Sequence, residues 1–158
     1  MNETFESEQK CKVLLQDGKR LFDLELYDEA IVCFNDALDD LTTDESLIIK
    51  NLMYKGRCFK KLKNHKDALF CFEKVLGYMS NHEFALRMRG ICLFELKDFK
   101  NAIECFTRAQ NVNHKEPAYW WWKSNCYDKL GDFDRMGECN NKYFDLYFKN
   151  PDDDKPEV

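Results

Sequence analysis

Eight cysteines are the residues of this sequence best suited to chemistry, and seven of them recur in two sets. Clustered thiolates bind metals or respond to oxidation, but zinc ligands usually occur as pairs a few residues apart. No C-x-x-C pair is present, and thirteen residues separate Cys58 from Cys71. A small apolar thiol in a repeated packing site explains the pattern better, so we expect neither a metal nor a cofactor and leave a redox role open. The sets are Cys58, Cys92 and Cys126, and Cys33, Cys71, Cys105 and Cys139.

Three histidines are the next candidates for chemistry. His65, His82 and His114 all fall at junctions between the helices expected below. An exposed turn or capping role is favoured there, because no nucleophile stands at a catalytic spacing from them. The sequence also contains no phosphate-binding loop, nucleophile elbow or HExxH motif. It therefore gives no residue-level support for an enzyme.

A basic stretch runs from Lys50 to Lys66 and could hold an anion. Three interpretations stay open, in decreasing order: a solvated helix face, a site for an acidic peptide, and a site for nucleic acid. The net charge of the chain is −5, so nucleic acid is the least favoured partner. The basic residues are Lys50, Lys55, Arg57, Lys60, Lys61, Lys63 and Lys66.

The composition limits the class of protein. The 158 residues suffice for one domain, and 44% of them are hydrophobic and 34% charged. Only six Gly and three Pro argue against a loop-rich or all-β fold. No stretch reaches the roughly 18 apolar residues of a membrane span, and the acidic N-terminus is unlike a secretory signal. We therefore expect no membrane association and a cytoplasmic protein, with the nucleus as the alternative.

The elements that must position these residues form an internal repeat. Similar segments begin at Gly56, Gly90 and Ser124, 34 residues apart, and a further copy begins at Gly18, 38 residues before Gly56. Within each copy the apolar residues follow i, i+4, i+7 spacing, which is one face of a helix. Polar, turn-prone segments separate two such helices in every copy. The expected helices span residues 8–24, 27–40, 45–62, 65–79, 82–96, 99–112, 116–130 and 133–149.

This repeat resembles the tetratricopeptide repeat (TPR) family over about residues 10 to 149. The matching positions in the second copy are Leu52, Gly56, Phe59, Ala68, Phe72 and Val75. The resemblance implies an all-α fold, a right-handed solenoid of about eight antiparallel helices. Met136 and Asn140 depart from the pattern, as is common in terminal repeats. The expected organisation is an N-terminal tail at 1–7, a single TPR domain at 8–149 with repeats at about 11–44, 49–82, 83–116 and 117–149, and an acidic disordered tail at 150–158.

In TPR proteins the first helix of each repeat lines a concave groove, and the resemblance implies such a groove here. Its residues are aromatic, apolar and basic, which suits a partner peptide or helix with hydrophobic and acidic residues. Of the three adjacent tryptophans, Trp120 is expected in the core, whereas Trp121 and Trp122 point toward the groove. The expected groove residues are Lys19, Lys50, Tyr54, Arg57, Phe84, Arg87, Met88, Trp121, Trp122 and Asn125.

Some TPR proteins bind the C-terminal carboxylate of heat-shock chaperones through a fixed set of Lys, Asn and Arg side chains. The corresponding positions here hold Leu15, Lys19, Tyr54, Phe84 and Met88 in one alignment of the repeats, which cannot bind a carboxylate bidentately. A shift by one repeat gives no better set. We therefore predict that this carboxylate clamp is absent.

The last expected helix carries exposed aromatic residues with no following helix to cover them. Such a surface suggests a homodimer or docking in a larger complex. The favoured function is thus a protein-interaction scaffold, adaptor or chaperone-like subunit. Self-assembly is the alternative, and RNA binding is a weaker one. The residues of this possible assembly patch are Tyr143, Phe144, Tyr147 and Phe148.

Overall fold

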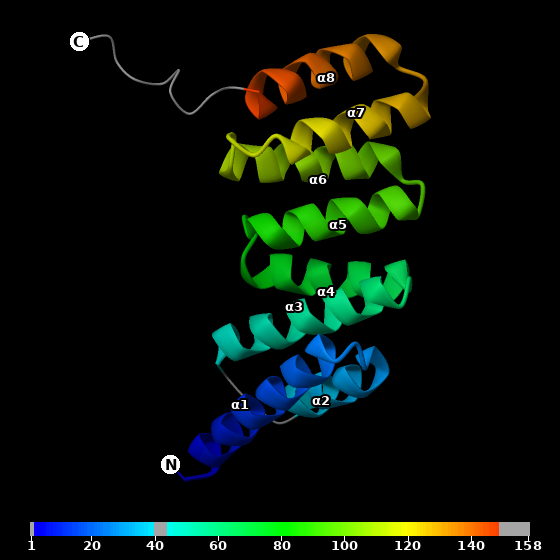
Figure 1. Cartoon of the computed structure of the whole chain (residues 1–158). Coiled ribbons are helices and arrows are strands. Elements are labelled where there is room, and N and C mark those ends of the chain that lie inside the picture. Colours follow the sequence, from blue (N-terminus) through cyan, green and yellow to red (C-terminus); the bar gives the residue numbers. More distant parts are fainter. Residues whose placement is uncertain (1, 40–43, 149–158) are drawn as a thin grey trace, which may run out of the picture.

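The computed structural model describes residues 2–39 and 44–148, and these residues form eight helices. Successive helices pair as hairpins that stack in chain order, from α1 at one end to α8 at the other (Figure 1). The predicted all-α hairpin architecture is therefore confirmed. The helices are α1 (Asn2–Asp23), α2 (Tyr27–Asp39), α3 (Glu45–Lys61), α4 (His65–Tyr78), α5 (Glu83–Glu95), α6 (Phe99–Val112), α7 (Ala118–Leu130) and α8 (Phe133–Tyr147).

The turn inside each hairpin has the same backbone geometry in all four copies. One residue adopts a left-handed conformation, with φ between 59° and 73°. The amide of the next residue then donates to a carbonyl five residues back, as from Asn64 to Phe59 at 2.8 Å, which ends the first helix. An Asn or Asp side chain caps the second helix in three copies, at Asn64, Asp98 and Asp132. The left-handed residues are Glu25, Lys63, Lys97 and Gly131.

A close contact between a glycine and a phenylalanine joins the two helices of each of the first three hairpins. A Cβ atom on Gly18, Gly56 or Gly90 would lie only 2.5 to 2.9 Å from a Phe ring. The three rings are fully buried. The small residues of the sequence pattern are thus required by close helix packing. The facing rings belong to Phe34, Phe72 and Phe106.

The fourth hairpin replaces this contact with a hydrogen bond. Ser124 and Asn140 occupy the corresponding positions. The Ser124 hydroxyl lies 2.7 Å from Asn140 Oδ1 and 3.2 Å from the Met136 carbonyl. Both residues of the Gly–Phe pair are therefore replaced together, and the polar Ser124–Asn140 pair joins α7 to α8.

The N-terminal end of the chain is helical rather than a tail. Helix α1 begins at Asn2, so the expected N-terminal tail at 1–7 is wrong from residue 2 onward. The sequence there continues helically before the repeat pattern begins. The acidic tail at 150–158 lies outside the described residues. No helix in the described part of the chain is both long and apolar enough to cross a bilayer.

Candidate functional site

The first helices of the repeats carry three separate groups of aromatic and basic side chains. In the first group, Lys19 from α1 and Arg57 from α3 both lie over the ring of Tyr54, at 5.2 and 4.8 Å. Arg57 also lies 4.5 Å from the ring centre of Phe22, which contacts Tyr54 edge-on. Such cation–π contacts hold both cations in place while leaving them partly accessible. Phe22 was not among the residues expected in the groove.

The second group lies on α5. The Arg87 guanidinium is 5.1 Å from the ring centre of Phe84, and both side chains are half-buried. Arg87 Nε is buried without a hydrogen-bond partner among the described residues. Met88, which was expected in the groove, is only 8% exposed and belongs to the main hydrophobic core. It therefore contributes packing rather than a binding contact.

The third group contains the tryptophans of α7. Trp122 is half-buried and stacks on Phe106, with ring centres 5.5 Å apart and an angle of 12° between planes. Trp121 is 44% exposed and meets Trp122 edge-on at 4.8 Å. Asn125 donates to the Trp121 carbonyl at 2.7 Å. Trp122 thus anchors the exposed Trp121 to the core.

Trp120 is not the core residue that we expected. It is half-buried, whereas its neighbour Tyr119 is fully buried and donates from its hydroxyl to Glu83 on α5. The corresponding Leu52 packs in one cluster with Ala85 from the next repeat. No helix beyond α8 is described that could cover Trp120 in the same way. Its indole lies instead beside the buried ammonium of Lys123, 4.0 Å from the ring centre.

The structure joins two sites that the sequence placed apart. Trp121 from the expected groove, and Tyr143 and Tyr147 from the expected assembly patch, line one open pocket of about 300 Å³. Glu116, Pro117 and Ala118 complete its wall. The two helices run in opposite directions, so the start of α7 lies beside the end of α8 (Figure 1). We call these six residues the end pocket.

Aromatic side chains continue from the end pocket over the last two turns of α8. Phe144, Tyr147 and Phe148 are 51%, 62% and 71% exposed. Tyr143 stacks on Tyr147, and Phe144 stacks on Phe148. The four rings support one another, which leaves a pre-ordered apolar surface at this end of the solenoid.

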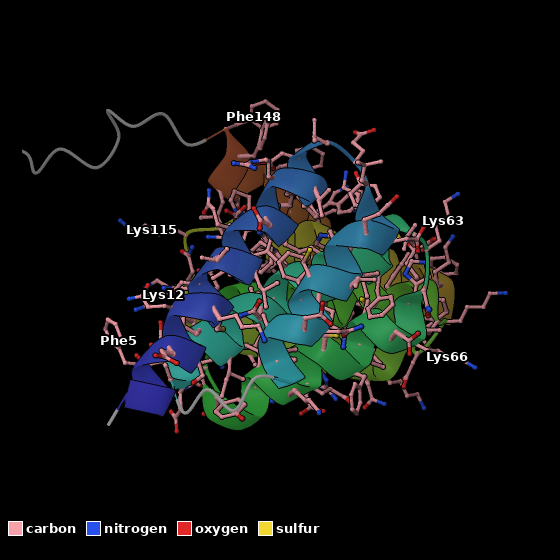
Figure 2. The ribbon with its side chains drawn as sticks, turned by 90° about the horizontal axis from the view of Figure 1, so that it is seen from below. Phe5, Lys12, Lys63, Lys66, Lys115 and Phe148 are labelled. Carbon is pink, nitrogen blue, oxygen red and sulfur yellow. The ribbon has the colours of Figure 1, made fainter. Side chains whose placement is uncertain are left out.

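The basic stretch at 50–66 does not form one surface. Arg57 belongs to the Tyr54 group, whereas Lys55 lines a pocket between α2 and α4. Lys50 is exposed. Lys63 and Lys66, near the turn between α3 and α4, project from the side opposite Lys12 and Lys115 (Figure 2). A helix distributes residues that are contiguous in sequence around its axis, so one charge run reaches several faces.

The cysteines occupy packing sites. All eight are free, and seven of them are buried, with Cys33 half-buried. Burial raises the pKa of Cys58 to about 12 and that of Cys71 to about 11, so at neutral pH these thiols are protonated and poorly nucleophilic. The described residues contain no cluster of three or more His, Cys, Asp or Glu side chains able to hold a metal. Among the histidines, His82 caps α5 by accepting from the Ala85 amide at 3.2 Å.

Comparison with known proteins agrees with this architecture. Residues 61–135 match the family model described as anaphase-promoting complex, cyclosome, subunit 3. A solved structure of MamA protein superposes with a TM-score of 0.82 at 15% identity, covering 97% of this chain and 82% of that chain. The structure of MamA 41-end from Desulfovibrio magneticus RS-1 gives 0.78 at 20% identity, covering 87% and 75%. The chain has the MamA-like TPR fold. No curated protein matches the sequence.

The TPR fold explains which aromatic residues sequence analysis overlooked. Phe22 and Phe94 both stand four residues after the small residue of their repeat. Phe22 contacts Tyr54, and Phe94 contacts Trp122 edge-on at 5.5 Å. The regular position within the repeat was the available signal. Each of these rings reaches an aromatic residue on the first helix of the next TPR repeat.

Proposed function

We propose that this chain is a protein-interaction module that binds a segment of a partner protein along the first helices of its repeats. The end pocket is the observation that carries the proposal. It is open, it is lined by three aromatic rings, and its size suits one large apolar side chain. Aromatic anchors of this kind supply most of the binding free energy in protein interfaces. The partner segment is therefore expected to insert an apolar residue beside Trp121.

The basic groups toward the other end suit acidic residues in the same partner segment. Lys19 and Arg57 are held over Tyr54, so they lose little side-chain entropy on binding. Within the described part of the chain, Arg87 Nε is a buried donor without a partner, a situation that costs about 1–3 kcal/mol. An acceptor on the partner would remove this cost. Charge complementarity of this kind mainly sets the association rate and the register.

A comparison of matched variants tests the proposal. Trp121→Ala with Tyr147→Ala removes the end pocket, whereas Phe133→Ala removes a ring that is 66% exposed at the other end of α8. Affinity purification with mass spectrometry, followed by calorimetry on the partner found, should show at least tenfold weaker binding to the first variant, or about 1.4 kcal/mol. Trp122 is unsuitable for this test because it packs on Phe106.

The control variant should bind as the wild type does. A partner set that is the same for all three proteins would reject the end pocket as the binding site. Circular dichroism must first show that the double variant keeps its helical content and melting temperature.

Self-assembly is the second candidate function, and the exposed rings of α8 favour it. The opposite end of the solenoid also exposes an apolar residue. Val13 is 59% exposed there, although the corresponding residues of the other repeats are fully buried. Two uncovered ends allow a head-to-tail contact between copies. The partly matching family model describes a subunit of a multiprotein complex, which also suits docking through this surface.

Phe144→Asp separates the two candidate functions. Phe144 is exposed but does not line the end pocket. If α8 mediates self-assembly, sedimentation velocity should show oligomers in the wild type that this variant loses, while binding of a partner at Trp121 is kept. A wild-type protein that stays monomeric at about 100 μM would reject self-assembly. The cytoplasm or nucleus as compartment, the chaperone-like role and the missing carboxylate clamp stay predictions.

A further inference from the structure

Basic residues recur at two positions of the repeat and form a column on the side of the second helices. One position lies on the first helix of each repeat and the other on the second helix. In repeats two to four both positions hold Lys or Arg, at intervals of 34 residues, whereas repeat one holds Asp17 and Asp36. The first-helix residues are Lys55, Arg89 and Lys123, and the second-helix residues are Lys74, Arg108 and Lys142.

Arg89, the middle first-helix residue of the column, has both an ion-pair partner and a hydrogen-bond partner inside the fold. Arg89 lies between α4 and α6, and its side chain is only 23% exposed. Its Nε donates to the Glu73 carboxylate at 3.3 Å, and its Nη1 donates to Cys105 Sγ at 3.0 Å. A carboxylate from the preceding repeat thus neutralises this guanidinium.

In the residues that the structure describes, the two flanking members of the column have no such carboxylate. Repeats one and three place Asn35 and Thr107 where repeat two has Glu73. Lys55 and Asn35 line a pocket of about 420 Å³ together with Lys74 and the 56%-exposed Phe70. Within the described residues, no ion pair to Lys55 occurs. An open pocket therefore stands where the middle repeat has an internal ion pair.

Lys123 repeats the situation in the last hairpin. It is 8% exposed, and its ammonium donates to the amide oxygen of Gln110 at 2.8 Å rather than to a carboxylate. It lines a pocket of about 310 Å³ with Trp120, Arg135 and Lys142. Arg135 is already paired with Asp132 at 2.7 Å. Glu138 also lines this pocket, but it forms no ion pair with Lys123 among the described residues. A buried ammonium without a counter-ion is costly.

We propose that these two pockets, at Lys55 and at Lys123, bind carboxylate side chains from an acidic segment of a partner protein. The internal Glu73–Arg89 pair is the precedent for the missing interaction. Phe70 and Trp120 add an apolar wall to each pocket, which suits an acidic segment that also carries an apolar side chain. This surface involves different residues from the end pocket, so the chain offers two independent binding faces.

Nucleic acid fits this face less well than an acidic polypeptide. Each of repeats two to four contributes only two basic residues to this column, and repeat one contributes none, whereas nucleic-acid binding relies on many phosphate contacts at close spacing. Glu73, Glu104 and Glu138 stand one or four residues from basic residues of the second helices, and they would repel a continuous phosphate backbone. Separate pockets match separate acidic side chains better.

The test uses a fluorescein-labelled peptide of alternating Glu and Asp around one Phe. A control peptide replaces the acids by Gln and Asn, and a short oligouridylate represents RNA. Fluorescence anisotropy should show binding of the acidic peptide that weakens as salt is raised. Lys55→Glu with Lys74→Glu, and separately Arg135→Glu with Lys142→Glu, should each weaken it about tenfold, as expected for a lost charged hydrogen bond.

Two further variants address general charge effects and folding. Lys66→Glu with Lys115→Glu changes the net charge equally, at residues that project from opposite sides of the molecule (Figure 2), and should leave the affinity unchanged within about twofold. Gln110→Glu supplies a carboxylate beside Lys123 without a change of shape. It should weaken peptide binding while keeping or raising the melting temperature, so a loss of binding cannot be attributed to unfolding.

Three results would overturn the proposal. The first is equal affinity for the acidic and the amide peptide. The second is an equal loss of binding in the Lys66/Lys115 control variant. The third is oligouridylate binding tighter than the acidic peptide, which would make the face a nucleic-acid site. Trp121→Ala should leave binding of the acidic peptide intact, because Trp121 lines neither pocket.

Discussion

The contact between Gly90 and Phe106 allows a quantitative test of how the repeats are packed. A Cβ atom at Gly90 would lie 2.7 Å from Phe106 Cε1 and 2.9 Å from Cζ. Carbon atoms normally approach to about 3.5–4.0 Å, so the ring must move by roughly 1 Å. Phe106 is fully buried and stacked on Trp122. A shift of the Phe106 ring would therefore also displace Trp122, which lies on α7.

Gly137 supplies the matched control. It lies inside α8, and a Cβ atom there would meet no other heavy atom within 4 Å. Replacement of a helical Gly by Ala gains about 1 kcal/mol through helix propensity at either position. Overpacking costs about 1–3 kcal/mol at Gly90 alone. We expect Gly137→Ala to raise the free energy of unfolding by about 1 kcal/mol and Gly90→Ala to lower it by about 1 kcal/mol.

Urea denaturation followed by circular dichroism at 222 nm measures both free energies. The difference between the two variants, about 2 kcal/mol, isolates the packing cost because the propensity gain cancels. Phe106→Leu should make room for the new methyl group, so Gly90→Ala should be less harmful in that background, by at least about 1 kcal/mol. If the two alanine variants change stability equally, the close packing of Gly90 against Phe106 is refuted.

Three further predictions concern titration and turn geometry. Burial raises the pKa of Cys58 and Cys126 to about 12 from an ordinary value of 9.0. Above pH 9 the thiol ionises in the unfolded chain but stays protonated in the fold, so the stability that is fully present below pH 9 is lost as the pH rises. The free energy of unfolding should therefore fall by about 1 kcal/mol per thiol by pH 10. Urea titrations should show a smaller fall for Cys58→Ala with Cys126→Ala, and an unchanged fall would contradict the assignment. Burial lowers the pKa of Lys123 below 10.5, which penalises folding at neutral pH and ceases to do so above about pH 10.5. Lys123→Met should therefore gain stability over the wild type at pH 7 and lose this advantage as the pH rises; a constant difference would show that the charge is not the cause. Lys97→Gly should raise the melting temperature by a few degrees, since Lys97 has a φ of 64° and glycine adopts this conformation freely. Gly131→Ala in the corresponding turn should lower it, and the same sign for both variants would contradict the argument.

The candidate sites were predicted from the sequence only in part. Lys19, Tyr54 and Arg57 were expected on one surface, and the structure brings them together through cation–π contacts. Met88 was expected there too but is buried, whereas Tyr54 and Trp122 at the same repeat position are half-buried. Trp120 was expected in the core but lies beside Lys123 at a half-covered pocket. Position within a repeat predicts the direction of a side chain, whereas its burial depends on which neighbouring helix covers it.

The sequence alone determined the repeat, the helix pairs and the role of the small residues. A period of 34 residues with i, i+4, i+7 spacing allows few other folds, since each copy must bury its apolar face against the next. Only the tertiary structure decided which residues of different copies meet. Trp121 and Tyr147 share a pocket because antiparallel packing brings the start of α7 to the end of α8. Likewise, Glu73 neutralises Arg89, while Lys55 and Lys123 have no such partner among the residues that the structure describes. This distinction depends on contacts between repeats rather than on the pattern within one.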